Sequence, residues 1–481
     1  MIATPMHEPP GSRALRNRTR AIGLALAALV AASGCGEHSG SRIAAGALEK
    51  YRKTSGAKPL PASGMMRLRL AAPADRPPAS GSDEVLWEPR RYRESVSSAG
   101  LTTIRGIESG KAYFTDQDGV TRVASDQILR ELTTRSYFWR RAWLFEERER
   151  AWLDFAREDA TTVSVSLRPE GGNPLTLTFS RADGRLLTAR SPRFSLEFTS
   201  PRAFRDFSDP GNPVDGEIAW VGLRTGPIVQ AYAGGGQSRF GAAAADGAPF
   251  ERRSGTLTVP AAVLGRTVRL AIDASADGPV ILSPDLAGRL GLVFTPDVFG
   301  RRVAPAASLE VAGVVYPSLW MQRSREPLPG GADAMAGGCL FREAAVEFDP
   351  EAGRVRLHDS QTWSAPEGYF RIVIDDDDDR PIAILNRGKS ELRLAAGSDT
   401  GDAAIVLAAA SAEREGLAGA NEAAGFTWGL IHLPALPMTI AREGFHPDWG
   451  DDGRLGFAVL LRFHAFVNMP ERWIYVKAVA P

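Results

Sequence analysis

The chain has 481 residues, of which 44% are hydrophobic and 24% charged, so it can bury a large core and is not a disordered protein. Its 57 Lys and Arg balance 57 Asp and Glu, so it lacks the basic field that nucleic-acid binding requires. The 49 Gly and 33 Pro are typical of many turns between short elements, which favours a mainly β protein of about two to four folding units.

The segment 1–34 is predicted to be a secretion signal. A run of arginines precedes apolar residues 21–32, which are too few to span a bilayer as a helix. The run ends in Ala32-Ser33-Gly34-Cys35, which resembles the bacterial lipoprotein box, with alanine where leucine is usual. The resemblance implies that Cys35 carries a lipid, that residues 35–44 form a tether, and that the protein contacts a membrane through its anchor.

The residue after the cysteine bears on localisation. Gly36 is not the aspartate that marks retention in the inner membrane, so the resemblance implies an outer-membrane lipoprotein that faces the periplasm. The alternative is an ordinary signal peptide with a chance cysteine, which would give a soluble periplasmic or secreted protein. If Cys35 is acylated, Cys339 has no internal partner, and we expect a buried free thiol there.

Antiparallel strands dominate the structure predicted for residues 45–225, after a helix expected over residues 45–58. Asp118-Gly119 and Asp183-Gly184 supply hairpin turns. Residues 128–157 carry a longer, aromatic-rich pattern that predicts helices covering the sheet. Three runs place every second side chain on one face, as half-buried strands do: 66–70, 163–167 and 175–179.

Residues 45–225 as a whole resemble the half-barrel of bacterial lipoprotein-carrier and lipoprotein-sorting proteins. The resemblance rests on residues 85–93, on residues 112–119, and on residues 202–216. It implies an incomplete barrel whose concave apolar face holds an acyl chain or a peptide, and hence a lipid or lipoprotein partner. The alternative is that the aromatic side chains fill the core beneath the helices.

One pattern occurs twice after a Gly- and Ala-rich linker predicted at residues 226–249. Its opening half is an apolar strand, a second apolar run and a helix. Its closing half is a glycine turn, a short helix and a hairpin. Both copies resemble the lobe of retropepsin-like (retroviral-type) aspartic peptidases, which implies lobes at 250–362 and 363–481. The matching segments are 268–292 and 337–357 in the first copy, and 392–417 and 452–476 in the second.

The predicted fold class is therefore mainly β: an N-terminal half-barrel antiparallel sheet with covering helices, followed by two retropepsin-like β-barrel lobes. The peptidase resemblance also implies a chemistry, in which one aspartate from each lobe holds a water and the two share a proton. Each aspartate sits in an Asp-Thr/Ser-Gly turn, where the hydroxyl crosses to the other lobe and glycine permits the bend. No cofactor is implied.

The first-lobe candidate is Asp273, at the end of an apolar strand, but Ala274 removes the crossing hydroxyl and Ser275 stands where glycine is expected. The second lobe contains a literal Asp399-Thr400-Gly401. Counting back from Leu407 supports Asp399 at the turn, whereas counting forward from residues 392–394 places Ala395-Ala396-Gly397 there and leaves the lobe without a carboxylate.

These departures favour a degenerate, inactive peptidase fold that binds a peptide or protein in the inter-lobe cleft. The alternative is an active aspartic endopeptidase that uses Asp273 and Asp399 as its dyad, with Thr400 and Gly401 shaping the turn. His432, His446 and His464 lack a metal-binding spacing, so the sequence predicts no metal site.

Overall fold

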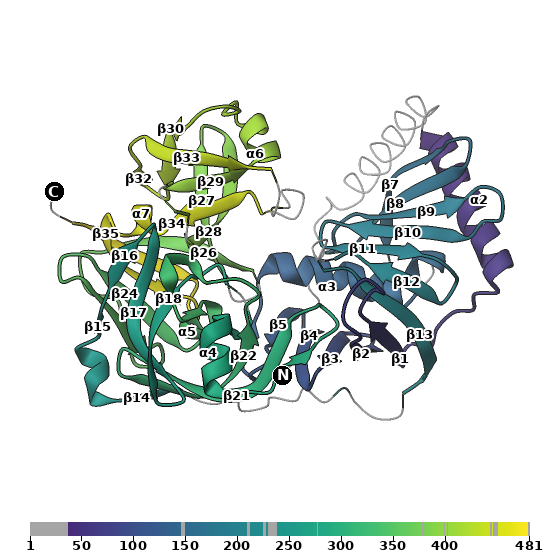
Figure 1. Ribbon diagram of the computed structural model, residues 1–481. Helices are drawn as coiled ribbons and strands as arrows, with labels where there is room; N and C mark the ends of the chain where they lie inside the picture. Colours follow the sequence, from purple (N-terminus) through teal and green to yellow (C-terminus); the bar gives the residue numbers. More distant parts are fainter. Residues whose placement is uncertain are drawn as a thin grey trace, which may run out of the picture.

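The computed structural model is mainly β, with three large sheets and few helices (Figure 1), which confirms the predicted fold class. It describes residues 37–145, 150–208, 212–224, 228, 238–276, 278–377, 380–398, 400–401, 403–442, 445 and 451–479. The predicted signal segment, Cys35 and Asp399 therefore lie outside the described residues. Within the described ranges, no helix combines the length and the apolar character needed to cross a membrane.

The first sheet is an antiparallel meander of 13 strands in which β1 also pairs with β13. Its end strands, β6 and β7, stay unpaired with each other, so the sheet remains open. We call this sheet with its covering helices the half-barrel. Its strands are β1 (Gly64–Ala71), β2 (Ser80–Glu88), β3 (Arg91–Ser98), β4 (Leu101–Glu108), β5 (Lys111–Thr115), β6 (Thr121–Val123), β7 (Ala151–Glu158), β8 (Thr162–Pro169), β9 (Leu175–Ser180), β10 (Leu186–Ser191), β11 (Phe194–Phe198), β12 (Ala203–Asp206) and β13 (Val214–Leu223).

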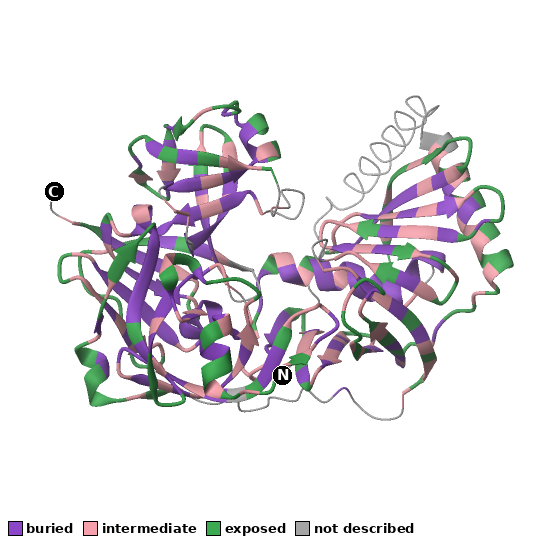
Figure 2. Cartoon of the chain, in the orientation of Figure 1, coloured by how far each residue is buried: buried purple, intermediate pink, exposed green. Residues whose placement is uncertain are grey.

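Three helical segments cover the half-barrel: α2 (Glu37–Ser55), α3 (Asp126–Trp139) and the 3-10 turn η1 (Ala142–Leu144). Aromatic side chains from α3 and η1 fill the space beneath them. Phe138 lies 5.0 Å from Phe194 of the sheet between ring centroids, and Trp139 and Trp143 are also buried. The structure therefore matches the alternative in which aromatic residues form the core, and Figure 2 shows this buried interior.

Two details differ from the sequence-based expectations. Helix α2 begins at Glu37, so it includes most of the predicted tether, because Ala44 and Ala47 pack into the half-barrel core. The helical pattern expected over 128–157 ends early: residues 151–158 form strand β7, and Trp152 is 55% exposed at this sheet edge. The strand predictions at residues 66–70, 163–167 and 175–179 are confirmed as β1, β8 and β9.

The second sheet has nine strands and forms most of the first lobe, which we call lobe 1 and define as the chain from β16 to β25. Two pairs of hydrogen-bonded strands in this sheet, β18–β23 and β19–β22, run parallel. Helices α4 (Pro284–Leu290) and α5 (Gly338–Phe341) follow β19 and β23. The strands are β14 (Arg239–Phe240), β16 (Glu251–Arg253), β17 (Thr256–Val263), β18 (Arg266–Ile272), β19 (Val280–Leu282), β20 (Thr295–Pro296), β21 (Arg302–Val311), β22 (Val314–Arg323) and β23 (Ala334–Ala336), and the 3-10 turns are η2 (Ala242–Ala245) and η3 (Pro329–Gly331).

The third sheet has 14 strands and joins lobe 1 to lobe 2, defined as the chain from β26 to β36. Its central contact is the antiparallel pair β24–β35, which links the last hairpin of lobe 1 to the last hairpin of the chain. One hydrophobic cluster spans both lobes, whereas the half-barrel has its own.

Lobe 2 also holds two short helices, α6 (Ala409–Arg414) and α7 (Phe457–Leu460). The strands of the third sheet are β15 (Ala248–Pro249), β24 (Ala344–Asp349), β25 (Arg354–Asp359), β26 (Phe370–Asp377), β27 (Arg380–Arg387), β28 (Ser390–Ser398), β29 (Ile405–Ala408), β30 (Glu422–Ala423), β31 (Phe426–Trp428), β32 (Ile431–His432), β33 (Leu436–Ala441), β34 (Gly453–Gly456), β35 (Phe463–Asn468) and β36 (Trp473–Ala478).

The half-barrel is fastened to lobe 1 by a buried ion-pair cluster. The turn between β5 and β6 carries Asp116 and Asp118, and both carboxylates contact the guanidinium of Arg342, which follows α5. The Nη2 atom of Arg342 lies 2.8 Å from Oδ2 of Asp118, and the backbone N–H of Trp320 donates to Oδ1 of Asp118 at 2.8 Å. The side chains of Arg342, Asp116 and Asp118 are at most 3% exposed.

Candidate functional site

The two lobes share a backbone arrangement that fixes which residues are equivalent. In lobe 1, the backbone N–H of Arg269 donates to Oδ2 of Asp333 at 3.0 Å, and the N–H of Asp333 donates to the Arg269 carbonyl at 2.9 Å. In lobe 2, Arg393 and Asp452 make the same two bonds, each 3.0 Å long. Arg269 and Arg393 therefore occupy equivalent positions on β18 and β28.

Asp273 lies four residues after Arg269, and Gly397 lies four residues after Arg393. The pairing of the strands agrees with this alignment as far as Ala396. Ile272 of β18 is opposite Ala336 in β23, and Ala396 of β28 is opposite Leu455 in β34. Each of these partners is followed by a glycine that precedes a short helix, α5 or α7. Beyond Ala396, β28 has a β-bulge, and Ser398 pairs with Gly456. The position of lobe 2 equivalent to Asp273 is therefore Gly397 by the count from Arg393 and Ser398 by the strand pairing, and neither residue carries a carboxylate.

The Asp273 turn is closely packed and its carboxylate has local partners. Asp273 is 8% exposed, and its Oδ1 accepts hydrogen bonds from the backbone N–H of Ser275 at 3.0 Å and from its hydroxyl at 2.6 Å. Its backbone N–H donates to the Ala336 carbonyl at 3.0 Å. The hydroxyl of Ser275 thus holds the aspartate from within the same turn.

The two lobes meet at this turn through backbone atoms. The N–H of Ala274 donates to the carbonyl of Gly397 at 3.2 Å, and a Cβ built on Gly397 would lie 3.4 Å from the Cβ of Ala274. The backbone of Gly397 has a φ of +74°, a conformation that glycine adopts readily. Gly397 therefore lies at a backbone contact between the two lobes.

The remaining candidates lie just beyond this turn. Asp399 is outside the described residues. The hydroxyl of Thr400 donates to the carbonyl of Ala403 in its own lobe. A Cβ at Gly255 of lobe 1 would lie 2.0 Å from the carbonyl oxygen of Gly401, so this loop packs directly on the other lobe. Thr400 and Gly401 therefore have packing and hydrogen-bond partners that do not depend on a catalytic role.

The hairpin between β20 and β21 is held by the half-barrel. Its tip residue Val298 is fully buried, and its N–H donates to the hydroxyl of Ser98 in β3 at 3.0 Å. Within the tip, Arg301 pairs with Asp297 at 2.7 Å. These contacts restrain the tip of the hairpin against the half-barrel.

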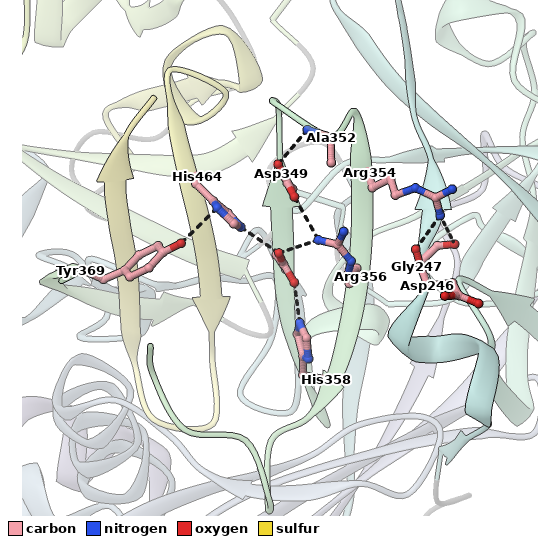
Figure 3. Close-up of polar contacts among 10 residues, drawn as sticks. Asp246, Gly247, Asp349, Ala352, Arg354, Arg356, His358, Tyr369 and His464 are labelled. Carbon is pink, nitrogen blue, oxygen red and sulfur yellow. Dashed lines mark hydrogen bonds and ion pairs between the residues drawn. The ribbon is translucent and has the colours of Figure 1, made fainter. Parts of the chain in front are cut away.

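A second polar cluster lies where the third sheet joins the two lobes (Figure 3). Glu347 on β24 has a histidine on each side: Nε2 of His358 lies 2.6 Å from its Oε2, and Nε2 of His464 lies 2.7 Å from its Oε1. Arg356 donates from Nη1 to Oε1 of Glu347 at 2.7 Å and to Oδ2 of Asp349 at 3.0 Å. Residues from β24, β25 and β35 are thereby tied together.

The chemistry of this cluster is that of an ion-pair network. Burial raises the pKa of Glu347, but the hydrogen bonds from His358 and His464 and the charge of Arg356 outweigh it and lower the pKa to about 2. Ligand atoms of Glu347, Asp349 and His464 lie within 4.8 Å of one another, a spacing compatible with a metal ion. Because Arg356 already bridges both carboxylates, a cation there would face a positive charge.

Sequence reasoning missed this cluster because it treated the histidines as scattered. His358 and His464 are far apart in the sequence, and only the pairing of β24 with both β25 and β35 brings them to one carboxylate. His432 is exposed and His446 lies outside the described residues. The sequence did hold a signal for this cluster. Charged residues occupy alternate positions of the hairpins that end the two lobes, and side chains at alternate positions of a strand lie on one face of a sheet.

A third group of charges is buried in the half-barrel. Nε of Arg135 lies 2.9 Å from Oε2 of Glu94, and Tyr92 donates its hydroxyl to the same carboxylate. Asp83 is 5% exposed, and its Oδ1 has no hydrogen-bond partner among the described residues. Burial, together with the negative charge of Glu94, raises the pKa of Asp83 to about 8. Asp83 is therefore predominantly neutral in the folded protein at pH 7.

Replacing Asp83 by asparagine is expected to stabilise the protein at pH 8 and to have little effect at pH 4. The folded state holds a proton on Asp83 up to about pH 8, whereas the unfolded state loses it near pH 4. Between these values the unfolded state binds fewer protons, so stability falls as pH rises. Asparagine removes this loss, which the two pKa values place at up to about 5 kcal/mol at pH 8.

Urea denaturation of wild type and Asp83→Asn at pH 4 and pH 8 measures this difference. The pH 4 data are the internal control for any effect of the amide on packing. Equal pH dependence of the two proteins would show that Asp83 ionises normally in the folded state.

Comparisons with known proteins find distant structural similarity only. No protein-family model matches the chain, and no curated protein sequence matches it. A retropepsin-like aspartic protease from Rickettsia conorii is 14% identical, with 23% of this chain and 88% of that chain covered and a TM-score of 0.19. A LolA superfamily protein from Nitrosomonas europaea is 12% identical, with 39% and 97% covered and a TM-score of 0.26. An aspartic proteinase from Irpex lacteus is 11% identical, with 48% and 97% covered and a TM-score of 0.30.

Proposed function

We propose that this protein is a cell-envelope binding protein whose two lobes descend from a retropepsin-like peptidase and hold a peptide or protein between them without cleaving it. We assign the half-barrel to residues 45–225, a linker to 226–249, and the lobes to 250–362 and 363–481. One observation supports the proposal: the count from Arg393 aligns Asp273 with Gly397, which has no side chain and whose carbonyl accepts a hydrogen bond from Ala274.

Aspartic peptidase chemistry needs two carboxylates, one from each lobe, within reach of one water. Neither Gly397 nor Ser398, the two residues that align with Asp273, carries one. Ser275 already donates two hydrogen bonds to Oδ1 of Asp273, one from its backbone N–H and one from its hydroxyl. The docked β20–β21 hairpin also lacks the freedom to exclude water from a substrate.

The competing proposal is an active endopeptidase with an Asp273/Asp399 dyad, favoured by the literal Asp399-Thr400-Gly401 motif. An assay of unfolded casein cleavage from pH 3 to pH 7 separates the two. We expect no cleavage by wild type and no difference in Asp273→Asn. Cleavage with an acid optimum that is blocked by a statine-type inhibitor and lost in Asp273→Asn would establish the peptidase instead.

Peptide binding is tested with fluorescein-labelled casein peptides by anisotropy. Ser275 is partly exposed beside Asp273, so Ser275→Trp is expected to weaken binding at least about tenfold by filling the space between the lobes. Thr267→Trp, on the exposed start of β18, is the matched control and should leave affinity unchanged. Equal affinity in both variants would place the peptide elsewhere.

We also propose that Cys35 anchors the protein in the outer membrane, facing the periplasm. The support is the basic flank, the short apolar run and the Ala32-Ser33-Gly34-Cys35 sequence. Wild type expressed in a Gram-negative host is expected to fractionate with membranes and to carry a lipid on its N-terminal peptide by mass spectrometry. Cys35→Ser should be soluble and unmodified, while Cys339→Ser should behave as wild type because that thiol is buried and burial raises its pKa to about 11.

A further inference from the structure

A cavity of about 590 Å³ lies where the half-barrel meets lobe 1. The loop between β1 and β2 forms one wall, and the ends of β21 and β22 form the other. Its charged lining is dominated by arginine. Four guanidinium groups and one carboxylate line it, and three prolines add apolar surface: Arg76, Arg302, Arg323, Arg325, Asp75, Pro77, Pro284 and Pro296.

Two of these arginines face each other in an unfavourable arrangement. Arg302 of β21 is directly opposite Arg323 of β22 in the antiparallel ladder, so both side chains leave the same face of the sheet. Like charges at directly opposite positions destabilise a sheet. Within the described chain, neither guanidinium forms an ion pair that would offset the repulsion.

The other two arginines converge on Gly300. A Cβ built on Gly300 would lie 3.5 Å from Nη2 of Arg325 and 3.6 Å from Nη1 of Arg76. Arg325 donates to the Gly300 carbonyl at 3.0 Å, which fixes its guanidinium at the cavity. The nearby carboxylate of Asp297 is already paired with Arg301, which leaves Asp75 as the acidic group of the lining.

We propose that this cavity binds an anionic ligand that carries a phosphoryl group. Arg302, Arg323 and Arg325 outnumber the carboxylate of Asp75, which leaves a local excess of positive charge that a dianionic group would neutralise. Guanidinium groups match phosphate oxygens with paired hydrogen bonds, and the volume leaves room for an organic body beside the proline surface. The ligand would contact both the half-barrel and lobe 1.

Binding is tested on the full chain by calorimetric titration with pyrophosphate. Arg302→Ala and Arg323→Ala are each expected to weaken binding about tenfold or more, because each removes a paired hydrogen-bond donor. Arg302→Lys keeps the positive charge but loses the paired donors of the planar guanidinium, so we expect an intermediate loss of affinity. Arg190→Ala is the control, since Arg190 is exposed and paired with Glu197 on the half-barrel sheet, and should bind as wild type.

Thermal unfolding supplies a second readout that does not depend on the choice of ligand. In phosphate-free buffer, Arg323→Ala is expected to raise Tm by about 1–3 °C because it removes the opposed charge. Addition of pyrophosphate should raise the Tm of wild type and reverse the order of the two proteins. A variant that fails to fold would show a lowered Tm in both buffers.

The source of the phosphoryl group is resolved by parallel titrations. Glycerol 3-phosphate represents a soluble ester, and vesicles of phosphatidylcholine with or without phosphatidic acid represent a lipid headgroup. The proposal is overturned if pyrophosphate, glycerol 3-phosphate and anionic vesicles all fail to bind, or if they bind equally to wild type and to the Arg302→Ala/Arg323→Ala double variant.

Discussion

Replacement of Arg342 by alanine is expected to lower the free energy of unfolding by about 3–5 kcal/mol. Arg342 contacts both Asp116 and Asp118, and all three side chains are at most 3% exposed. Without it, Asp118 loses its buried ion pair, and Asp116 is left with the more distant guanidinium of Arg122, at 3.9 Å. Burial already raises the pKa of Asp118 despite the opposing charge of Arg342, so the aspartate has little solvation of its own.

Calorimetry and urea denaturation measure this effect. Because the ion pairs join the half-barrel to lobe 1, we also expect wild type to unfold in one transition and Arg342→Ala to unfold in two. The matched control is Arg205→Ala, which removes an exposed pair with Asp215 at 2.6 Å. That loss should be no more than about 1 kcal/mol. A cost below about 1 kcal/mol for Arg342→Ala would mean that water reaches the two carboxylates.

Replacement of Gly337 by alanine is expected to cost about 3 kcal/mol or more. A Cβ at this position would lie 2.2 Å from the carbonyl oxygens of both Asp273 and Ala276. These are backbone atoms held by their own hydrogen bonds, so neither can move aside as a side-chain tip would. The substitution would therefore displace the Asp273 turn from α5.

The control is Gly288→Ala in helix α4 of the same lobe, where a Cβ meets no atom within 4 Å. Alanine there should be neutral or stabilise by up to about 1 kcal/mol, because it favours the helix. Denaturation by urea compares the two variants. A Gly337→Ala protein as stable as Gly288→Ala would show that the contact between the Asp273 turn and α5 is loose.

Local patterns predicted much of the fold. Alternation identified β1, β8 and β9, and the glycines of the two predicted hairpin turns, Gly119 and Gly184, have φ values of +83° and +73°. Strand alternation and hairpin turns depend on residues that are close together in the chain, so they can be predicted from the sequence. Trp152 was assigned to a helix but lies in the edge strand β7, where it is 55% exposed. The spacing of aromatic residues does not distinguish a helix that covers the sheet from an edge strand with exposed aromatic side chains.

The site could be predicted only in part. Asp273 follows a strand whose pattern is plain, but lobe 2 has one more residue between its turn and the next strand, so two counts were possible. The bonds of Arg393 with Asp452 align Gly397 with Asp273, whereas the bulge in β28 aligns Ser398 with it, and neither feature is visible in the sequence. The arginine cavity and the Glu347 cluster were invisible in the sequence because each is assembled from segments that long-range pairing brings together.

The pair β24–β35 has a consequence for how this molecule tolerates change. Main-chain hydrogen bonds between β24 and β35 and one shared hydrophobic cluster hold the two lobes together. The residues of β24 and β35 are far from the Asp273 turn in the sequence. Such bonds do not depend on which side chains stand at the Asp273 turn. Substitutions at that turn can therefore change its chemistry while the two lobes keep the same assembled shape.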